Sequence, residues 1–419
     1  MGNGVATMGN MEFFDKLETQ APEQREHEMF AALPRQIAHA KANAPHYSRL
    51  LADIDPDSIV DRASLAKVPL TRKSELHALQ RTAPPFGGLL AGKRLPVKVF
   101  VSPGPVYDPE GATEDYWRGA RALFAAGFRA GDLVQNCFSY HLTPGGSMME
   151  NGLIALGCSV IPGGVGQTEL QVATMADLRP IGYTGTPSFL KVILDRAADL
   201  KRELALKKAL VSGEAFLPPV RAALEAYGID AYQTYATADL GVIAYETSAR
   251  EGMVVDEGVI LEVVRPGTGD PVAEGEVGEV VVTTFNRDYP LIRFATGDLS
   301  ATLPGPSACG RTNIRIKGWM GRADQTTKVR GMFVHPHQIA EVAKRFESIR
   351  RVRVMVENTD GNDRMRVLCA LVNGGSDALR EEIEVAVRDV TKLRGDVEFV
   401  ELHALPNDGK VIEDARKFS

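Results

Sequence analysis

At 419 residues the chain is longer than one ordinary hydrophobic core, so two domains are the default expectation. A formal net charge of −6 and the lack of a long basic cluster argue against nucleic acid as a partner. The four cysteines are scattered without a CxxC pair, which argues against a disulfide framework and favours a reduced, cytoplasmic setting. No apolar run reaches the roughly 20 residues that span a bilayer, so no membrane partner is expected.

The first 96 residues predict a helical layer, with a helix over 23–52 that is interrupted near Pro34 and a Pro/Gly-rich stretch at 83–96. From residue 97 onward, strands alternate with helices. This alternation implies βαβ units and a largely parallel sheet covered on both faces. The predicted strands are 97–101, 132–138, 158–161 and 180–183, followed by a strand that leads into a turn at 208–215 and a strand end at 231–235. The predicted helices are 113–126, 145–156, 168–178, 187–200 and 218–227.

The pattern changes after residue 252. Two β-runs at 253–264 and 276–285 are joined by a Gly/Pro turn, which is typical of an antiparallel hairpin, and we predict a small β-rich section over 253–320. Beyond it, three strands and a helix predict a separate small lobe. The sequence therefore indicates an α/β fold, with a large N-terminal domain (1–321) of mainly parallel sheets flanked by helices and a small α+β C-terminal domain (322–419).

Two short motifs lie near this boundary. Thr296-Gly297-Asp298 closes an apolar, β-like run and places a carboxylate at a strand end, and Gly321-Arg322-Ala323-Asp324 follows about two dozen residues later. Each motif alone is most often a turn or a surface loop. Their order and spacing, with CGRT at 309–312 and VHPHQI at 334–339, resemble the phenylacetate-CoA ligase branch of the adenylate-forming ligases, which carries PLIRYRTRD, CGRT, RIxGRSDD and VFPSQIE.

The resemblance covers about residues 30 to 412 and implies an adenylate-forming ligase fold with a mobile C-terminal lid domain. It implies an AMP-forming acid–CoA ligase that uses ATP, CoA and Mg²⁺ to activate an aryl or other apolar carboxylic acid. Two alternatives stay open: an adenylating amide synthetase, and a pseudoenzyme that binds nucleotide or acyl-CoA. The oligomer to test is a homodimer.

The resemblance also implies roles for four residues near the C-terminal boundary and end. Asp298 would accept hydrogen bonds from both ribose hydroxyls, because an ionised carboxylate has two acceptor oxygens. Arg322 would bridge ribose and phosphate, and Asp324 would be the hinge of the mobile domain. Lys410, in LPNDGK, would bridge the substrate carboxylate and the α-phosphate.

Further site residues follow from the same alignment. Asp239 stands where the family has a magnesium-binding Glu, and its shorter side chain loses reach. The acyl pocket would be lined by Phe138, Tyr140, Pro144 and Gly145. The remaining nucleotide-binding residues would be Ser212, Gly213, Glu214 and Ala215 in a turn beside adenine, and Tyr235, Ala236 and Thr237 at a strand end, with Tyr235 stacked on the base.

Two features depart from the family pattern. The family's phosphate loop is close to SSGTTGKPT, but the loop predicted here at 102–111 has no Lys or Thr pair and adds Asp108 and Glu110. We expect these carboxylates to repel a triphosphate, so the protein would bind AMP or an acyl-adenylate better than ATP. A structural zinc site found in some relatives is not expected, because only Cys309 of its CxCG pattern is present and Thr247 stands where a Cys is expected.

Overall fold

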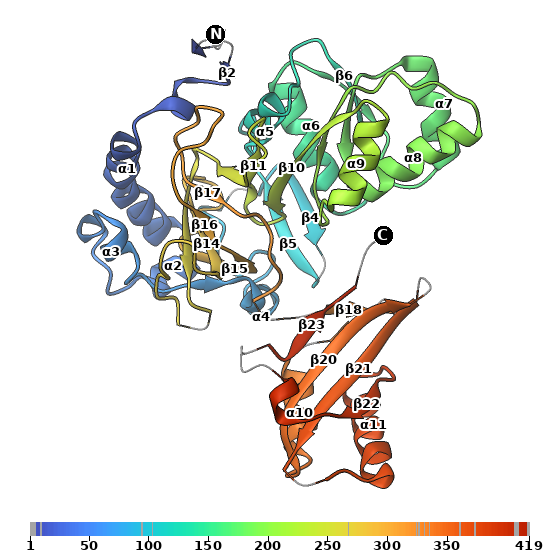
Figure 1. Ribbon diagram of the computed structural model, residues 1–419. Helices are drawn as coiled ribbons and strands as arrows, with labels where there is room; N and C mark the ends of the chain where they lie inside the picture. Colours follow the sequence, from blue (N-terminus) through green and yellow to red (C-terminus); the bar gives the residue numbers. More distant parts are fainter. Residues whose placement is uncertain are drawn as a thin grey trace. The chain divides into compact units, whose positions relative to one another are not determined.

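The computed structural model describes residues 6–8, 11–93, 95–102, 104–266, 268–323, 325, 327–330, 332–334, 336–359, 362–372, 374–405 and 410–416. Internal contacts divide the chain into two compact units, Met1–Met320 and Gly321–Ser419 (Figure 1). The domain boundary proposed from the sequence lies one residue further along. Across the described part of the chain, no helix is long and apolar enough to cross a membrane.

Within the described residues, a nine-stranded sheet is the largest sheet of the first unit (Figure 1). The strands from β10 to β7 run parallel, as the alternation of strands and helices predicts, and β11, β12, β17 and β16 continue the sheet in antiparallel pairings. The order is β16 (Thr302–Leu303), β17 (Arg315–Ile316), β12 (Met253–Val255), β11 (Gly241–Glu246), β10 (Asp230–Thr237), β9 (Lys208–Val211), β8 (Gly182–Gly185), β6 (Leu133–Asn136) and β7 (Ser159–Pro162).

Helices cover both faces of the parallel strands. On β9, Leu210 packs in the core cluster that contains α5 and α6, whereas Ala209 and Val211 pack in the cluster that contains α7, α8 and α9. Successive side chains of a strand point to opposite faces, so an almost wholly apolar strand is buried on both sides. The helices are α5 (Gly119–Ala125), α6 (Gly145–Ala155), α7 (Thr168–Leu178), α8 (Pro187–Asp199) and α9 (Pro218–Ala226).

A second sheet brings an early segment beside a late one. In the described chain it has four strands, in the order β13 (Val259–Val264), β14 (Gly278–Thr284), β15 (Phe294–Ser300) and β3 (Thr71–Arg72). β13 and β14 form the predicted antiparallel hairpin, although β12, within the same predicted run, joins the larger sheet. β3 pairs in parallel with β15. Lys73 follows β3 directly, so this pairing places it near the strand that carries Asp298.

The N-terminal helical layer differs from the prediction at Pro34. One helix, α1 (Pro22–Asn43), continues through this proline, so the predicted interruption is wrong. Its buried face, which includes Phe30, Leu33 and Ile37, packs into the core, and this packing offsets the hydrogen bond that the proline cannot donate. The layer also contains α2 (Pro45–Leu50), α3 (Arg62–Leu65), α4 (Leu76–Thr82), the strands β1 (Ala6–Met8) and β2 (Met11–Phe13), and the short 3-10 helices Lys16–Thr19, Pro56–Ser58 and Lys73–Glu75.

The predicted helix at 113–126 is wrong in its first half, because α5 begins only at Gly119. Asp115 and Arg118 have φ angles of 49° and 60°, in the left-handed region that a right-handed helix excludes. The Asp115 carboxylate instead accepts hydrogen bonds from the backbone N–H groups of Gly119 (2.7 Å) and Ala120 (3.1 Å), at the start of α5. A side chain that satisfies these free donors favours a late helix start.

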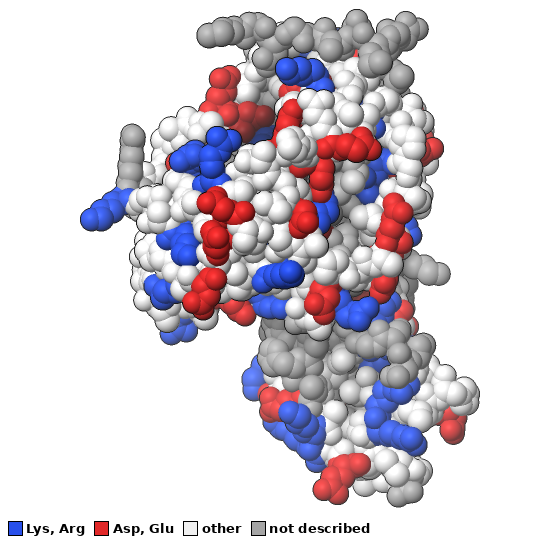
Figure 2. Space-filling model, turned by 90° about the vertical axis from the view of Figure 1, so that its left-hand side faces the viewer, with Lys and Arg blue, Asp and Glu red and all other residues white. Residues whose placement is uncertain are grey.

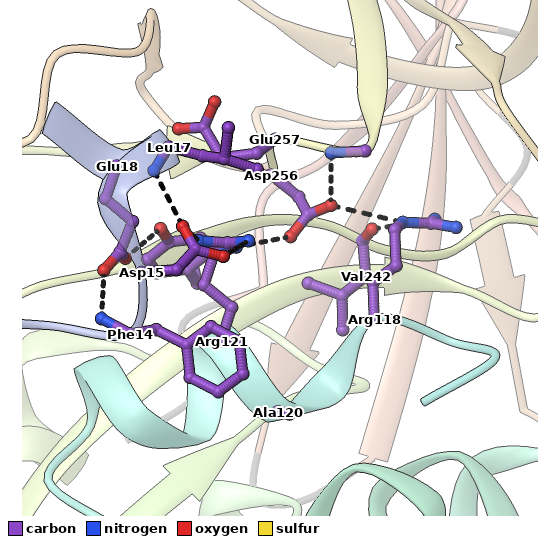
Figure 3. A network of polar contacts seen from close by, with 12 residues as sticks. Phe14, Asp15, Leu17, Glu18, Arg118, Ala120, Arg121, Val242, Asp256 and Glu257 are labelled. Atoms are coloured by element: carbon purple, nitrogen blue, oxygen red, sulfur yellow. Dashed lines mark hydrogen bonds and ion pairs between the residues drawn. The ribbon is translucent and has the colours of Figure 1, made fainter. Parts of the chain in front are cut away.

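A buried group of charges, which we call the anchor cluster, fixes the segment before α1 to the first unit (Figure 3). Arg121 donates to both oxygens of Asp15 at 2.9 and 2.8 Å, and Arg118 lies 3.3 Å from Asp256. The Arg311 Nε donates to the Glu18 carboxylate at 2.7 Å. The members of the anchor cluster are Asp15, Glu18, Arg25, Arg118, Arg121, Asp256, Glu257 and Arg311.

The second unit is built on its own sheet, with the order β22 (Asp396–Phe399), β21 (Asn362–Leu371), β20 (Ile349–Thr359) and β23 (Ile412–Asp414). β20 and β21 form a long antiparallel hairpin, and the outer strands pair with them in parallel. Ile383 and Val387 of the longer helix pack into the same core as the sheet. The other elements are β18 (Thr327–Val329), β19 (Met332–Val334), α10 (Pro336–Lys344), α11 (Asp377–Thr391) and the 3-10 helix Leu402–Ala404.

Candidate active site

Several of the predicted site residues follow the carboxyl ends of strands in the parallel part of the sheet. Phe138 comes shortly after β6, Ser212 directly follows β9, and Tyr235 lies near the end of β10. Because the carboxyl ends of parallel strands meet at one edge of a sheet, the topology gathers these residues at that edge. This is where open α/β sheets bind their ligands.

The predicted adenine turn adjoins the predicted acyl pocket. The Ser212 hydroxyl donates to the carbonyl of Thr234 at 2.7 Å and thereby ties the turn to β10. Glu214 accepts a hydrogen bond of 2.7 Å from the backbone N–H of Ser188, at the start of α8. A Cβ added to Gly213 would lie 3.7 Å from the Phe138 ring, so a side chain here would narrow the space between the two regions.

Asn136 organises the predicted acyl pocket. This fully buried amide donates to the Tyr140 hydroxyl and to the carbonyl of Gly146, both at 2.8 Å. Gly145, the first residue of α6, packs beside Phe138, because an added Cβ would lie 3.5 Å from that side chain. The hydrogen bonds therefore hold Phe138, Tyr140 and the start of α6, with Pro144 directly before it, in one place. Binding of the acid by these residues stays a prediction.

Asp298 lies inside β15, not at its end as predicted. The pairing with β14 shifts register next to it, and Gly297 has a φ angle of 77°, which glycine adopts without steric cost. The buried Asp298 carboxylate accepts hydrogen bonds from the Tyr235 hydroxyl at 2.9 Å and the Trp319 Nε1 at 3.1 Å. The bulge thus turns an acceptor group toward the end of β10. No role for Trp319 is predicted from the sequence.

β10 is itself irregular at the predicted nucleotide-binding residues. Its register with β11 shifts between Tyr235 and Ala236, and the Thr237 hydroxyl accepts a hydrogen bond of 3.2 Å from the backbone N–H of Leu240. A β-bulge re-aims side chains and is frequent beside binding sites. The Tyr235 hydroxyl is directed to Asp298 and to Thr296, 3.3 Å away.

The predicted phosphate loop at 102–111 is a β-hairpin for most of its length. β4 (Lys98–Ser102) pairs with β5 (Val106–Glu110) in antiparallel register, so the predicted loop is wrong for the residues of β5. The expected repulsion by Glu110 is also wrong. Its carboxylate lies 2.8 Å from the Lys98 ammonium and accepts from Trp117 Nε1 at 2.6 Å and Ser147 Oγ at 2.7 Å, so its charge is neutralised inside the fold.

Lys73, for which no role is predicted from the sequence, lies beside one of the predicted site residues. Its ammonium lies 2.5 Å from Oδ2 of Asp239, the predicted metal ligand. Burial opposes the Lys73 charge, but the carboxylates of Asp239, Asp108 and Asp298 outweigh this effect and raise the pKa of Lys73. A lysine brought in by the β3–β15 pairing therefore supplies the positive charge that the hairpin lacks. Its place in a segment similar to the family's KLPFTTKxDL was the available signal.

Asp108 is the second charged group of the hairpin, and it is fully buried. Neither of its oxygens has a hydrogen-bond partner within the described structure, and the same holds for Oδ1 of Asp239. Burial, together with the nearby charge of Asp239, raises the pKa of Asp108 well above its ordinary value, although the Ser102 hydroxyl and the Lys73 ammonium oppose this shift. We call Lys73, Asp108 and Asp239 the hairpin cluster.

Two predicted residues, Arg322 and Lys410, lie in the second unit. Hydrogen bonds connect the segment that follows Arg322 to the segment that follows Lys410. The side-chain oxygen of Gln325 accepts hydrogen bonds from the backbone N–H groups of Val411 and Ile412, the latter at 2.9 Å. Arg353 donates to the Lys410 carbonyl at 3.2 Å. Arg322 is half-buried and Lys410 is exposed. The predicted hinge residue Asp324 lies outside the described residues.

The Cys309 thiol lies in a polar environment. Ser307 Oγ is 3.1 Å from its sulfur, and Arg311 Nη1 donates to it at 3.6 Å. Burial opposes ionisation of Cys309, but hydrogen bonds from Ser307, Thr247 and Arg311 outweigh it and lower the pKa of the thiol. Among the described residues, no group of three or more His, Cys, Asp or Glu side chains is arranged to hold a metal ion.

The described residues on the visible surface form no large patch of purely positive or purely negative charge. On the face shown in Figure 2, Lys and Arg side chains are interspersed with Asp and Glu. A mixed surface of this kind gives little attraction for a polyanion.

Comparison with known proteins identifies the family. No family model matches the chain. A phenylacetate-coenzyme A ligase of Thermus thermophilus is 32% identical over 350 residues, which cover 79% of this chain and 78% of the relative. A phenylacetate-coenzyme A ligase of Aromatoleum evansii is 33% identical over 324 residues, 73% of this chain and 72% of the relative.

A solved structure supports the same fold. A 2-hydroxyisobutyryl-CoA ligase in complex with 2-HIB-AMP and CoA matches with a TM-score of 0.72 at 24% identity, over 96% of this chain and 92% of that chain. At this identity the likeness shows a shared fold. The chain therefore belongs to the phenylacetate-coenzyme A ligase family, which confirms the family, the adenylate-forming fold and the ATP-dependent acid–coenzyme A ligase class predicted from its motifs.

Proposed function

We propose that the protein activates an aryl or other apolar carboxylic acid with ATP and transfers the acyl group to coenzyme A. A carboxylate oxygen of the acid attacks the α-phosphorus of ATP, and the bond to the pyrophosphate leaving group breaks. The thiol of coenzyme A then attacks the acyl carbon of the adenylate, and AMP leaves. The observation that carries this proposal is the buried Asp298, held by Tyr235 at the edge where the adenine turn and the acyl pocket also lie.

Asp298 and its neighbours account for nucleotide binding. The two carboxylate oxygens accept hydrogen bonds from Tyr235 and Trp319, and a carboxylate offers about four lone-pair positions in all. In the proposed complex the ribose hydroxyls donate to these oxygens. Tyr235 lies against the base, and the turn at 212–215 contacts the edge of adenine.

The charged residues account for the chemistry of the phosphates. Lys73 would neutralise negative charge on the β- and γ-phosphates, since it is the lysine that the structure brings to the hairpin. Lys410 would bridge the acid and the α-phosphate, and Arg322 would bridge ribose and phosphate. Both belong to the second unit, for which we propose a mobile lid with its hinge near Asp324.

A magnesium ion is part of the proposal, and the residues present fit it. Oδ1 of the buried Asp239 has no hydrogen-bond partner within the described structure, and carboxylate oxygens are the ligands that magnesium prefers. The ion would supply charge neutralisation for the leaving pyrophosphate. All four cysteines are buried free thiols, which supports a reducing, cytoplasmic compartment. The oligomer that we propose to test is a homodimer.

One assay separates this function from the two alternatives. Aryl and aliphatic carboxylic acids are incubated with ATP and magnesium, with and without coenzyme A, and AMP and acyl-CoA are quantified. We expect AMP release that requires both an apolar acid and coenzyme A. Pyrophosphate exchange without consumption of coenzyme A would favour the amide synthetase, and nucleotide binding without any turnover would favour the pseudoenzyme. Family membership already favours the ligase.

A further inference from the structure

The hairpin at the predicted phosphate end directs a carboxylate into the protein interior. Gln80 holds β5 in place through two bonds to Tyr107, donating to its carbonyl and accepting from its N–H, both at 2.8 Å. Adjacent residues of a strand point to opposite sides, so the exposed side chain of Tyr107 fixes Asp108 as inward-facing. The Asp108 side chain is therefore fully buried.

Three buried side chains whose charges interact with one another carry polar atoms without a hydrogen-bond partner within the described structure. They are both oxygens of Asp108, Oδ1 of Asp239, and the hydroxyl of Tyr289. The other oxygen of Asp239 is 2.5 Å from Lys73, whose side chain is the only part of the hairpin cluster with appreciable exposure, at 24%. Asp108 and Asp239 thus share one ammonium group, and one negative charge is left over when both are ionised.

A buried carboxylate without a partner is costly, and charges in protein interiors are normally paired or bound to metal. Glu110 shows what the same strand does with a carboxylate that has a structural role. That side chain, two residues from Asp108, has Lys98, Trp117 and Ser147 around it. Asp108 has no such set, which indicates that its partner is a ligand.

We propose that Asp108 and Asp239 together bind one divalent cation of the magnesium type, with Asp108 as a second protein ligand contributed by the hairpin. The inference rests on the proposed function, in which this cation accompanies the nucleotide. Asp239 is one methylene shorter than the Glu of the family pattern, and a second carboxylate from the facing hairpin compensates for the lost reach. The Lys73 contact with Oδ2 leaves Oδ1 of Asp239 for the metal.

The site is tested by direct binding of Mn²⁺, a spectroscopic substitute for magnesium, to the full chain. Free Mn²⁺ is measured by electron paramagnetic resonance during titration, with and without AMP. We expect Asp108→Asn and Asp239→Asn each to weaken Mn²⁺ binding at least tenfold. Glu110→Gln is the matched control, since it alters a buried carboxylate of the same strand, and it should leave Mn²⁺ affinity unchanged. Circular dichroism of each variant verifies that it is folded.

Wild-type affinity in Asp108→Asn, or no Mn²⁺ binding by the wild-type protein, would overturn the inference. Either result would mean that Asp108 is held as an uncharged acid without a metal. The outcome is independent of the proposed function. If both carboxylates bind Mn²⁺ but no acyl-CoA forms, the proposed function is rejected and the cation site is retained. If acyl-CoA forms but Asp108→Asn leaves the Mn²⁺ affinity unchanged, the cation site is rejected and the proposed function is retained.

Discussion

The two buried charged groups of the first unit, the anchor cluster and the hairpin cluster, differ in their balance of charge. The anchor cluster contains four arginines and four carboxylates, and each carboxylate has an arginine nitrogen within 3.3 Å. The hairpin cluster has two carboxylates and one lysine, and three of its carboxylate oxygens have no partner in the described part of the chain. Removing charges from water is offset only by close pairing. The balanced cluster therefore serves the fold, and the unbalanced one indicates a ligand.

The largest expected effect comes from breaking the anchor cluster. Arg311→Met leaves the fully buried Glu18 without its cation, and we expect the free energy of unfolding to fall by about 3–5 kcal/mol. Urea unfolding followed by circular dichroism measures this change. Lys191→Ala, which removes an exposed ion pair with Asp195, is the control and should change nothing measurable. An equally small effect of Arg311→Met would show that the anchor cluster is not structural.

Asp298 is the site carboxylate that does have donors, so its removal should affect the ligand more than the fold. Asp298→Ala would remove two charge-assisted hydrogen bonds to ribose, each worth roughly 1.5–3 kcal/mol. We expect AMP affinity to fall by at least about 100-fold in isothermal calorimetry. Asp298→Asn keeps the shape of the side chain but loses its charge, so its AMP affinity should lie between those of the wild-type protein and Asp298→Ala. Unchanged AMP affinity in the alanine variant would remove Asp298 from the nucleotide site.

Substitution in the hairpin cluster should have the opposite sign to substitution in the anchor cluster. Asp108→Leu replaces a buried polar group that lacks protein partners with an apolar one of similar size. We expect the free energy of unfolding in metal-free buffer to rise by about 1–3 kcal/mol. Urea unfolding in the presence of a chelator measures it. A loss of stability would mean that Asp108 has a structural partner and would cancel the contrast between the clusters.

The anchor cluster also makes stability depend on pH. Burial raises the pKa of Glu257 to about 7, although Arg25 opposes this shift. The folded protein therefore holds a proton that the unfolded chain, with an ordinary Glu pKa of 4.5, releases. Stability from this group is complete below the unfolded pKa and is lost as the pH rises toward 7, with a slope of at most about 1.4 kcal/mol per pH unit.

Glu257→Gln should flatten this slope in urea unfolding measured from pH 4.5 to pH 7.5. If Arg25 instead keeps Glu257 ionised throughout, the wild-type protein will lose stability toward acid pH, and the substitution will remove that loss. Whether stability falls toward alkaline or toward acid pH thus decides whether burial or the ion pair with Arg25 dominates the pKa of Glu257.

The smallest expected effect is spectroscopic. The chain has two tryptophans, and Trp319 is 51% exposed and donates to Asp298, whereas Trp117 is 1% exposed. AMP binding at Asp298 should change the fluorescence of Trp319 alone. Trp319→Phe should abolish the change and weaken AMP binding less than tenfold. A fluorescence change that survives Trp319→Phe would place the nucleotide elsewhere.

Most of the fold could be predicted because its signals are local. The parallel strands and their helices follow from alternation of apolar runs, and the hairpin of β13 and β14 follows from its Gly/Pro turn. The errors arise where distant residues override local propensity. Packing carries α1 through Pro34, and the left-handed residues Asp115 and Arg118 delay the start of α5.

The candidate site also has a part that local sequence predicts and a part that depends on distant residues. The residues Asp298, Tyr235 and Ser212 could be proposed as site residues because each lies in a short recognisable stretch, and the structure brings Tyr235 to Asp298. The segment around Lys73 resembles a family segment, but the contact of Lys73 with Asp239 could not be predicted, since the two residues are 166 positions apart along the chain. A charge acquires its function from what surrounds it, and that is not written in the local sequence.

The sequence by itself determined the family, the reaction class and the order of strands and helices, because these depend on motifs and periodicity over short distances. Only the tertiary structure decided how Asp108 and Glu110 differ, although two residues separate them on one strand. Glu110 meets three donors and becomes part of the fold, whereas Asp108 is buried beside the charge of Asp239 and neither of its oxygens makes a hydrogen bond of ordinary geometry among the described residues. Burial and pairing are properties of the assembled chain, so the role of each carboxylate follows from its surroundings.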